Sequence, residues 1–178
     1  MPDWQAEAII LSVRPHGEGS AVISVLTADY GRHAGLVRGG ASSKMRGIMQ
    51  PGNRVRVSWR ARLSEQLGQM QIELTQSVPA LLLDSPLRLC GVASMCALLD
   101  GALPEREAQP GLFEGSAALL DVIVLDDDNA GWVEGYVRWE LGLLAAVGYR
   151  LDLARCVASG QTNDLAFVSP KSGGAVAR

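Results

Sequence analysis

Arg54-Val55-Arg56-Val57-Ser58-Trp59-Arg60 is the stretch that decides the fold of the first half of this sequence. Polar and apolar side chains alternate along it, which is the period-two pattern of a β-strand with one exposed and one buried face. The arginines share one face, and the two valines and the tryptophan take the other. The stretch therefore predicts an amphipathic strand that presents a row of positive charge.

Outward from this strand, four more short segments are apolar or alternate in the same way, and turn residues such as Gly17, Gly19 and Pro51-Gly52-Asn53 separate them. A Gly/Ser/Lys-rich loop is expected at 38–44. The other predicted strands are Ala8–Val13, Ala21–Thr27, His33–Val37 and Met70–Thr75. Five short strands with tight turns predict a small barrel, because closure leaves no exposed edge.

After Pro79 the hydrophobic period becomes helical. Ser85 suits a helix cap and Pro86 a first helical residue. Three helices are predicted, from Pro86 to about Asp100, over roughly 112–125, and from about 131 to Gly148. The third carries an apolar stripe of Trp132, Tyr136, Trp139, Leu143 and Val147. The sequence thus predicts an α+β, multidomain chain, with a five-stranded barrel domain at 1–79 and an all-α helical domain at 80–178.

The charge of the chain is unevenly distributed, although its net value is only −3. Residues 1–80 hold nine Lys/Arg and six Asp/Glu, a net of +3, whereas residues 81–178 hold seven and thirteen, a net of −6. Between Tyr30 and Ser64 no acidic residue occurs. The eight basic residues of that run are Arg32, Arg38, Lys44, Arg46, Arg54, Arg56, Arg60 and Arg62. Arginine suits phosphate because its guanidinium group binds two oxygens at once, so these eight are the candidate DNA-binding residues.

An alternative for this run is a solvated strand face whose arginines pair with acids elsewhere in the chain. Few aromatic side chains lie nearby: Tyr30 flanks the run, and Trp59 is expected to face the core. Binding would therefore rest on backbone charge more than on base stacking, with weak sequence specificity.

No catalytic constellation is recognisable in the sequence. His16 and His33 lie in or beside turns, where surface or packing roles fit better than catalysis. Asp126-Asp127-Asp128 suits a helix start better than a metal site, since consecutive acids point in different directions. Gly17-x-Gly19 and Gly39-Gly40 lack the Lys-Ser/Thr of a phosphate loop. The expectation is a protein that is not an enzyme and needs no cofactor.

Cysteine usage and hydropathy bear on the compartment. Cys90, Cys96 and Cys156 are too few for a disulfide framework, which fits a reducing cytoplasm. No signal peptide is recognisable at the N-terminus, and the apolar run Leu141–Val147 is far too short to span a membrane. A cytoplasmic protein without a membrane partner is expected.

An ordered set of short motifs resembles the RecO family of bacterial DNA repair proteins. In the first half these are Trp4-x-x-x-x-Ala8-Ile9-Ile10-Leu11, Gly17-Glu18-x-Ser20, Leu26-Thr27-x-x-x-Gly31, Val37-Arg38-Gly39 and Gln50-Pro51-Gly52. In the second half they are Arg138-Trp139-Glu140-Leu141-x-Leu143-Leu144-x-x-x-Gly148-Tyr149, Asp152-Leu153-x-x-Cys156 and Val168-Ser169-Pro170-x-x-Gly173-Gly174. No single motif is specific, but the ordered set is.

The resemblance implies an oligonucleotide/oligosaccharide-binding (OB) fold in the N-terminal domain, followed by the helical domain. It implies binding of single- and double-stranded DNA and annealing of complementary strands at the nucleoid. It further implies help in loading the RecA recombinase onto DNA coated by single-strand-binding protein, in concert with RecR.

Two departures from the family pattern matter. Many relatives carry a four-cysteine zinc site, but here only Cys156 is kept, and Ser159 and Ala177 stand at expected ligand positions. One thiolate cannot make a tetrahedral site, so no bound metal is expected. The sequence also stops soon after Gly173-Gly174, where relatives usually continue. The helical domain is therefore expected to be incomplete at its C-terminus.

A partner site is predicted on the third helix. The family's single-strand-binding partner ends in an acidic tail with apolar terminal residues, whose receptor needs an apolar groove and a basic side chain. Arg138 and Trp139 are the candidate partner-binding residues. An equally good alternative is a surface arginine, or one paired with Glu134 at i, i+4.

Two other function classes stay open at this stage. A non-enzymatic module that binds another polyanion, such as structured RNA, would use the same barrel face. An enzyme of unrecognised type would reveal itself by turnover of a nucleotide substrate.

Overall fold

The computed structural model describes residues 2–40, 42–126 and 131–178. The chain forms two compact units, Met1–Tyr136 and Val137–Arg178. The first unit holds a barrel and helices, and the second holds the rest of the last helix and a small sheet. The domain division at residues 79 and 80 stays a prediction.

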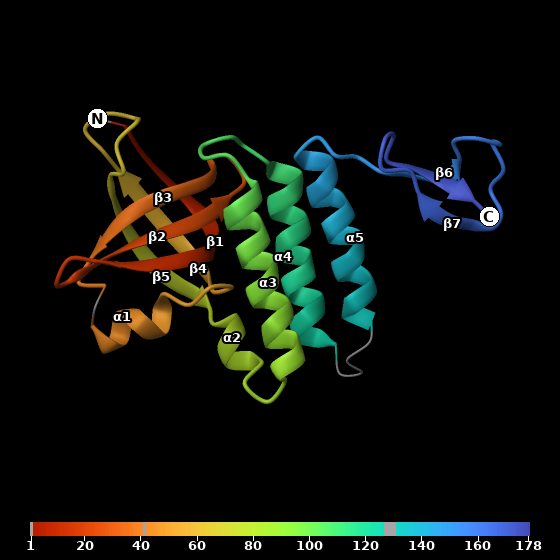
Figure 1. Cartoon of the computed structure of the whole chain (residues 1–178). Coiled ribbons are helices and arrows are strands. Elements are labelled where there is room, and N and C mark those ends of the chain that lie inside the picture. Colours follow the sequence, from red (N-terminus) through yellow and green to blue (C-terminus); the bar gives the residue numbers. More distant parts are fainter. Residues whose placement is uncertain (1, 41, 127–130) are drawn as a thin grey trace. The chain divides into compact units, whose positions relative to one another are not determined.

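Five strands close into a barrel in the order β1-β2-β3-β5-β4, with β4 returning to pair with β1 (Figure 1). Their bounds are β1 Asp3–His16, β2 Ser20–Thr27, β3 Gly31–Arg38, β4 Arg54–Arg60 and β5 Gln69–Gln76. The long β1 pairs with both of its neighbours, and β3 meets β5 in parallel at Leu36 and Gln69. The α+β fold with a five-stranded barrel is thus confirmed.

The barrel core follows the alternation of its strands. Along β4, Val55, Val57 and Trp59 are buried, whereas Arg56 and Arg60 are exposed and Arg54 is half-buried. The strongest sequence pattern therefore predicted the side-chain directions of this strand correctly. Ile10 from β1 and Ile23 and Val25 from β2 belong to the same core.

A short helix, α1 (Ser43–Ile48), lies where the sequence predicted only a loop and a turn. The Ser42 hydroxyl accepts a hydrogen bond from the Met45 N–H, 3.3 Å away, at its start. The Asn53 side chain donates to the carbonyls of Gly47 and Ile48 near its end, at 3.3 and 2.8 Å. A helix of six residues is too short to show a hydrophobic period, so its stabilisation comes from these caps and from the barrel core.

The helices of the first unit follow the barrel. Their bounds are α2 Val78–Leu81, α3 Pro86–Ala102, α4 Pro110–Leu125 and α5 Gly131–Ala146, of which the last continues into the second unit. Pro86 begins α3 as predicted, but the Ser85 hydroxyl accepts from Arg88 Nε instead of capping the helix. Asp126 accepts from the Trp132 N–H at 2.6 Å at the start of α5, and Asp127 and Asp128 lie outside the described residues.

The second unit, Val137–Arg178, contains a three-stranded sheet that the sequence did not predict. Its strands are β6 Asp152–Cys156, β7 Leu165–Val168 and β8 Gly174–Ala177, in the order β6-β8-β7. The expected all-α character of residues 80–178 therefore holds only as far as α5. Strands of four or five residues with mostly exposed side chains carry no usable alternation. In the stretches that the structure describes, no helix is long and apolar enough to cross a membrane.

Candidate nucleic-acid interface

Five of the eight predicted DNA-binding residues are exposed and make no ion pair with the acids that the structure describes. They are Arg38 at the end of β3, Lys44 and Arg46 on α1, Arg60 at the end of β4, and Arg62 in the loop that follows. All five come from segments that belong to the barrel, so the structure gives the barrel exposed positive charge. Their cations are available to phosphate oxygens without loss of an internal partner.

The barrel surface has a hollow whose lining includes Arg38 and Arg60, at the ends of β3 and β4. The hollow has a volume of about 610 Å³ and is lined from β1, β3, β4, β5 and α1. Its lining includes Asp3, Gln5, Leu36, Arg38, Met45, Ser58, Arg60, Gln69, Gln71 and Ile72. We call this hollow the barrel groove.

Strand register explains why polar side chains gather in the barrel groove. Gln5 pairs with Ser58 and Ser58 with Gln71, while Asp3 pairs with Arg60 and Arg60 with Gln69. Residues paired across adjacent strands point to the same face, so these form two parallel rows of hydrogen-bonding groups. Amide groups both donate and accept, which suits base edges and sugars as well as phosphates. The sequence analysis missed these glutamines, although the alternation of 70–75 already placed Gln71 on the exposed face.

The other three arginines are paired with acids, as the alternative reading of the basic run expected. Arg56 lies 3.0 Å from Glu7 and 3.8 Å from Glu73 on neighbouring strands. Arg54 turns to α4, where it donates to the Ala117 carbonyl at 2.5 Å and lies 2.8 Å from Asp121.

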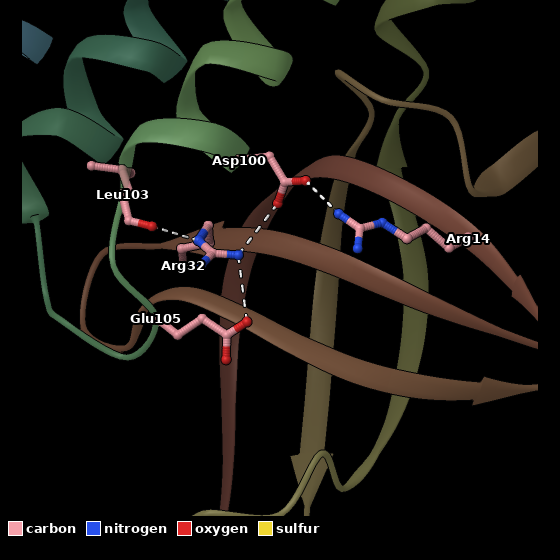
Figure 2. Close-up of polar contacts among 5 residues, drawn as sticks. All are labelled: Arg14, Arg32, Asp100, Leu103 and Glu105. Carbon is pink, nitrogen blue, oxygen red and sulfur yellow. Dashed lines mark hydrogen bonds and ion pairs between the residues drawn. The ribbon is translucent and has the colours of Figure 1, made fainter.

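Arg32 contacts three residues from the helical part of the first unit (Figure 2). Its Nε donates to the Leu103 carbonyl at 2.7 Å, and its Nη1 lies 3.5 Å from Asp100 and 3.4 Å from Glu105. Asp100 is shared with Arg14, 3.4 Å away. Arg32 and Arg54 therefore hold helices to the barrel. Their assignment to DNA stays a prediction, and binding DNA would require them to give up these contacts.

One end of the barrel core is aromatic. Trp4 stacks on Tyr30 with 4.2 Å between ring centroids, and His33 packs edge-on against Trp4 and Trp59 at 5.0 and 4.7 Å. His33 is only 4 % exposed. Burial, helped by the nearby charge of Arg106, lowers the pKa of His33 to about 4. A buried neutral imidazole enclosed by rings is a packing group, which agrees with the packing role expected from the sequence.

The second unit places Cys156 without partner cysteines nearby. Its Sγ accepts from the N–H groups of Ser159 and Ala177, at 3.4 and 3.3 Å. Hydrogen bonds from the Ser159 hydroxyl and from these backbone groups lower the pKa of the Cys156 thiol to about 6. Within the described ranges, no cluster of three His, Cys, Asp or Glu residues is suited to hold a metal ion. The expectation that the protein binds no zinc stays a prediction.

The predicted partner-binding pair on α5 has two different environments. Arg138 is exposed, whereas Trp139 is only 7 % exposed. Both residues make further interactions within the protein. A tail-binding surface at this position would therefore use Arg138 directly, and the indole of Trp139 at most through its edge.

A closed five-stranded barrel with the strand order β1-β2-β3-β5-β4 defines a class of protein, the OB-fold proteins. Comparison with known proteins narrows the class. The family model described as "Recombination protein O N terminal" matches residues 1–78, and "Recombination protein O C terminal" matches residues 83–178. This chain belongs to the RecO family.

Curated relatives extend over almost the whole chain. The DNA repair protein RecO of Rhodospirillum centenum is 51 % identical over 176 residues, which are 98 % of this chain and 69 % of the relative. The RecO protein of Jannaschia sp. (strain CCS1) is 47 % identical over 99 % of this chain and 70 % of its own length. That of Cereibacter sphaeroides (strain ATCC 17029) is 50 % identical over 100 % and 72 %. The family resemblance seen in the sequence motifs is confirmed, and with it a role in DNA repair and recombination.

Proposed function

We propose that this chain is a non-enzymatic recombination mediator. It binds single- and double-stranded DNA, anneals complementary strands, and helps to load RecA onto single-stranded DNA coated by single-strand-binding protein, together with RecR, at the nucleoid in the cytoplasm. The observation that supports this most directly is the barrel groove, where Arg38 and Arg60 flank rows of amide and hydroxyl groups.

The chemistry of the barrel groove suits a nucleic-acid strand. Arg38, Arg60 and the adjacent Arg62, with Lys44 and Arg46 on α1, would neutralise phosphates and release their counterions. Gln5, Gln69 and Gln71 would supply hydrogen bonds without reading one particular base. The exposed aromatic surface is small, because Trp59 is buried and Trp4 stacks on Tyr30. Weak sequence preference is the expected result, and it is what an annealing protein requires.

Annealing needs two strands to be held close while their bases stay accessible. A protein that neutralises backbone charge lowers the repulsion between the strands and lets pairing proceed. The contacts proposed for the arginines and for Lys44 fall on phosphates, so these contacts leave the Watson–Crick edges free to pair. No bond is made or broken by the protein in this scheme.

The partner assignment on α5 is part of the same proposal. Arg138 would bind the terminal carboxylate of an acidic tail, in the manner of other carboxylate-capturing sites. Substituting Arg138→Ala should weaken binding of a synthetic acidic tail peptide with apolar end residues. Unchanged affinity would remove Arg138 from the proposal and leave the DNA-binding part intact.

The experiment for DNA function compares the wild type with an Arg38/Arg60/Arg62→Ala variant in two assays, binding of a labelled single-stranded oligonucleotide and annealing of complementary strands. An Arg150/Arg155/Arg178→Ala variant removes the same charge from exposed positions of the second unit and is the matched control. The proposal expects faster annealing by the wild type and the control, and loss of the effect in the barrel variant. A strong preference for duplex RNA, or conversion of the nucleic acid to a new product, would contradict it.

A further inference from the structure

The connection between α3 and α4 lies against the start of β3. Arg32 Nε donates to the Leu103 carbonyl at 2.7 Å, and the Arg106 N–H donates back to the Arg32 carbonyl at 2.8 Å. Arg32 and Glu105 form an isolated parallel bridge. Residues 103–107 thus form a segment, called the strap, that lies against the start of β3. Figure 2 shows its first part beside Arg32.

Close packing confirms that the strap is fitted to the barrel. A Cβ atom at Gly31 would lie 1.8 Å from the Glu107 carbonyl oxygen, so only glycine leaves room for the strap backbone. Gly31 also has a φ of 60°, which L side chains rarely adopt. The sequence at the start of β3 is therefore adapted to a segment more than 70 residues away in the chain.

From the strap, the side chain of Arg106 reaches the loop between β4 and β5. Its Nη1 donates to the Ser64 carbonyl, and its Nη2 donates to the Gln66 carbonyl at 2.8 Å. One planar guanidinium group thus binds two carbonyls of the same loop. The Arg106 backbone has a φ of 65°, an unusual conformation for a residue with a side chain, and this conformation belongs to the strap that aims Arg106 at the loop.

The loop held by Arg106, residues 61–68, borders the barrel groove. Arg60 precedes it and Gln69 follows it, and these two groove residues pair across β4 and β5. Arg62 lies within the loop and is exposed. On the other side, the Trp59 indole N–H donates to the Leu67 carbonyl at 2.9 Å. The loop is therefore anchored at both of its ends and, through Arg106, along its middle.

We infer that Arg106, which lies outside the barrel, is a positioning residue for nucleic-acid binding. It holds the 61–68 loop in place and so keeps Arg62 beside the groove. The inference rests on the proposed function. Without this anchor the loop would have to be ordered when the strand binds, and the entropy of that ordering would oppose binding. Arg106 itself need not touch DNA.

The test uses the full chain and a labelled single-stranded oligonucleotide. Arg106→Asn keeps a residue that tolerates positive φ but removes the guanidinium group. Arg106→Lys keeps a cation that can donate to both carbonyls. Arg155→Ala removes one exposed positive charge from the second unit and controls for net charge. Thermal unfolding of each variant shows which of them remain folded at the assay temperature.

The inference expects Arg106→Asn to bind about fivefold more weakly, Arg106→Lys to recover part of the loss, and Arg155→Ala to bind like the wild type. Combining Arg106→Asn with Arg62→Ala should cost less than the two single changes multiplied, because both act through one loop. The salt dependence of Arg106→Asn should fall toward that of Arg62→Ala.

Three results would overturn the inference. The first is wild-type affinity in a folded Arg106→Asn variant. The second is independent, multiplicative effects of Arg106→Asn and Arg62→Ala. The third is a wild-type protein that fails to bind the oligonucleotide, which would reject the proposed function together with the inference. The first two results leave the proposed function standing.

Discussion

Arg32 on β3 and Asp100 on α3 form an ion pair, 3.5 Å between Nη1 and Oδ1, that joins the barrel to the first long helix (Figure 2). Both side chains are largely buried, at 18 and 13 % exposure. Asp100 also balances Arg14 on β1. A carboxylate shared by two strands of the barrel is the most buried charged contact between the barrel and its helices in the described residues.

Replacing Asp100→Asn should therefore destabilise the protein by about 2 kcal/mol, between the values typical of exposed and fully buried pairs. The loss arises because Arg32 keeps its charge in a largely buried place without its more buried carboxylate partner, and the more exposed Glu105 remains as its only carboxylate partner among the described residues. Urea unfolding at neutral pH measures the change in the free energy of unfolding.

Glu7→Gln is the matched control for this prediction. It removes the same charge from the pair with Arg56, in which the side chains are 54 and 56 % exposed. A change below about 0.5 kcal/mol is expected there. Equal losses in the two variants would show that burial of the Arg32 and Asp100 pair has no special weight.

Two glycines of α3 should respond in opposite directions to alanine. A Cβ at Gly91 would lie 2.7 Å from the ring of Trp132, whereas a Cβ at Gly101 meets nothing within 4 Å. Gly91→Ala should cost about 1–3 kcal/mol through overpacking, and Gly101→Ala should stabilise by up to about 1 kcal/mol through helix propensity. Thermal and urea unfolding report both. Stabilisation by both substitutions would contradict the tight approach of Trp132 to α3.

Stability should also depend on pH through His33. Burial disfavours the imidazolium and lowers the pKa of His33 from its usual 6.5 to about 4 in the folded protein. The unfolded chain then binds the proton more readily, so the stability contributed by this group is complete above pH 6.5 and is lost as the pH falls toward 4. The upper limit of the effect is about 3 kcal/mol.

His33→Phe isolates this contribution, because it keeps an aromatic ring among Trp4, Tyr30 and Trp59 and cannot titrate. The free energy of unfolding should be measured for the wild type and the variant at several pH values. The wild-type value minus the variant value should decrease as the pH falls from 6.5 toward 4. A difference that is independent of pH would show that His33 is not buried as described.

The sequence predicted the barrel well because its strands alternate in the way that a two-faced sheet demands. Val55, Val57 and Trp59 are buried as expected. Helix α1 was missed, since six residues show no period, and so was the sheet of the second unit, whose strands are four or five residues long. Local pattern carries information only over elements long enough to repeat it.

The candidate site was predicted only in part, because a run of basic residues does not reveal its partners in space. Arg32 and Arg54 belong to the same run as Arg38 and Arg60, yet they pair with acids on α3 and α4. Those acids lie more than 60 residues further along the sequence, which is too far for a local motif to link them to the arginines. The role inferred for Arg106 was invisible in the sequence for the same reason, since its two carbonyl partners lie 42 and 40 residues away.

The salt dependence of oligonucleotide binding tests the central claim most directly. Affinity should fall steeply with salt for the wild type and for Arg150/Arg155/Arg178→Ala. For Arg38/Arg60/Arg62→Ala, affinity should be much weaker. The slope of log K against log salt should be shallower by an amount that corresponds to the loss of up to about three phosphate contacts. An unchanged slope and affinity in the barrel variant would place the DNA site elsewhere and contradict the account of the barrel groove.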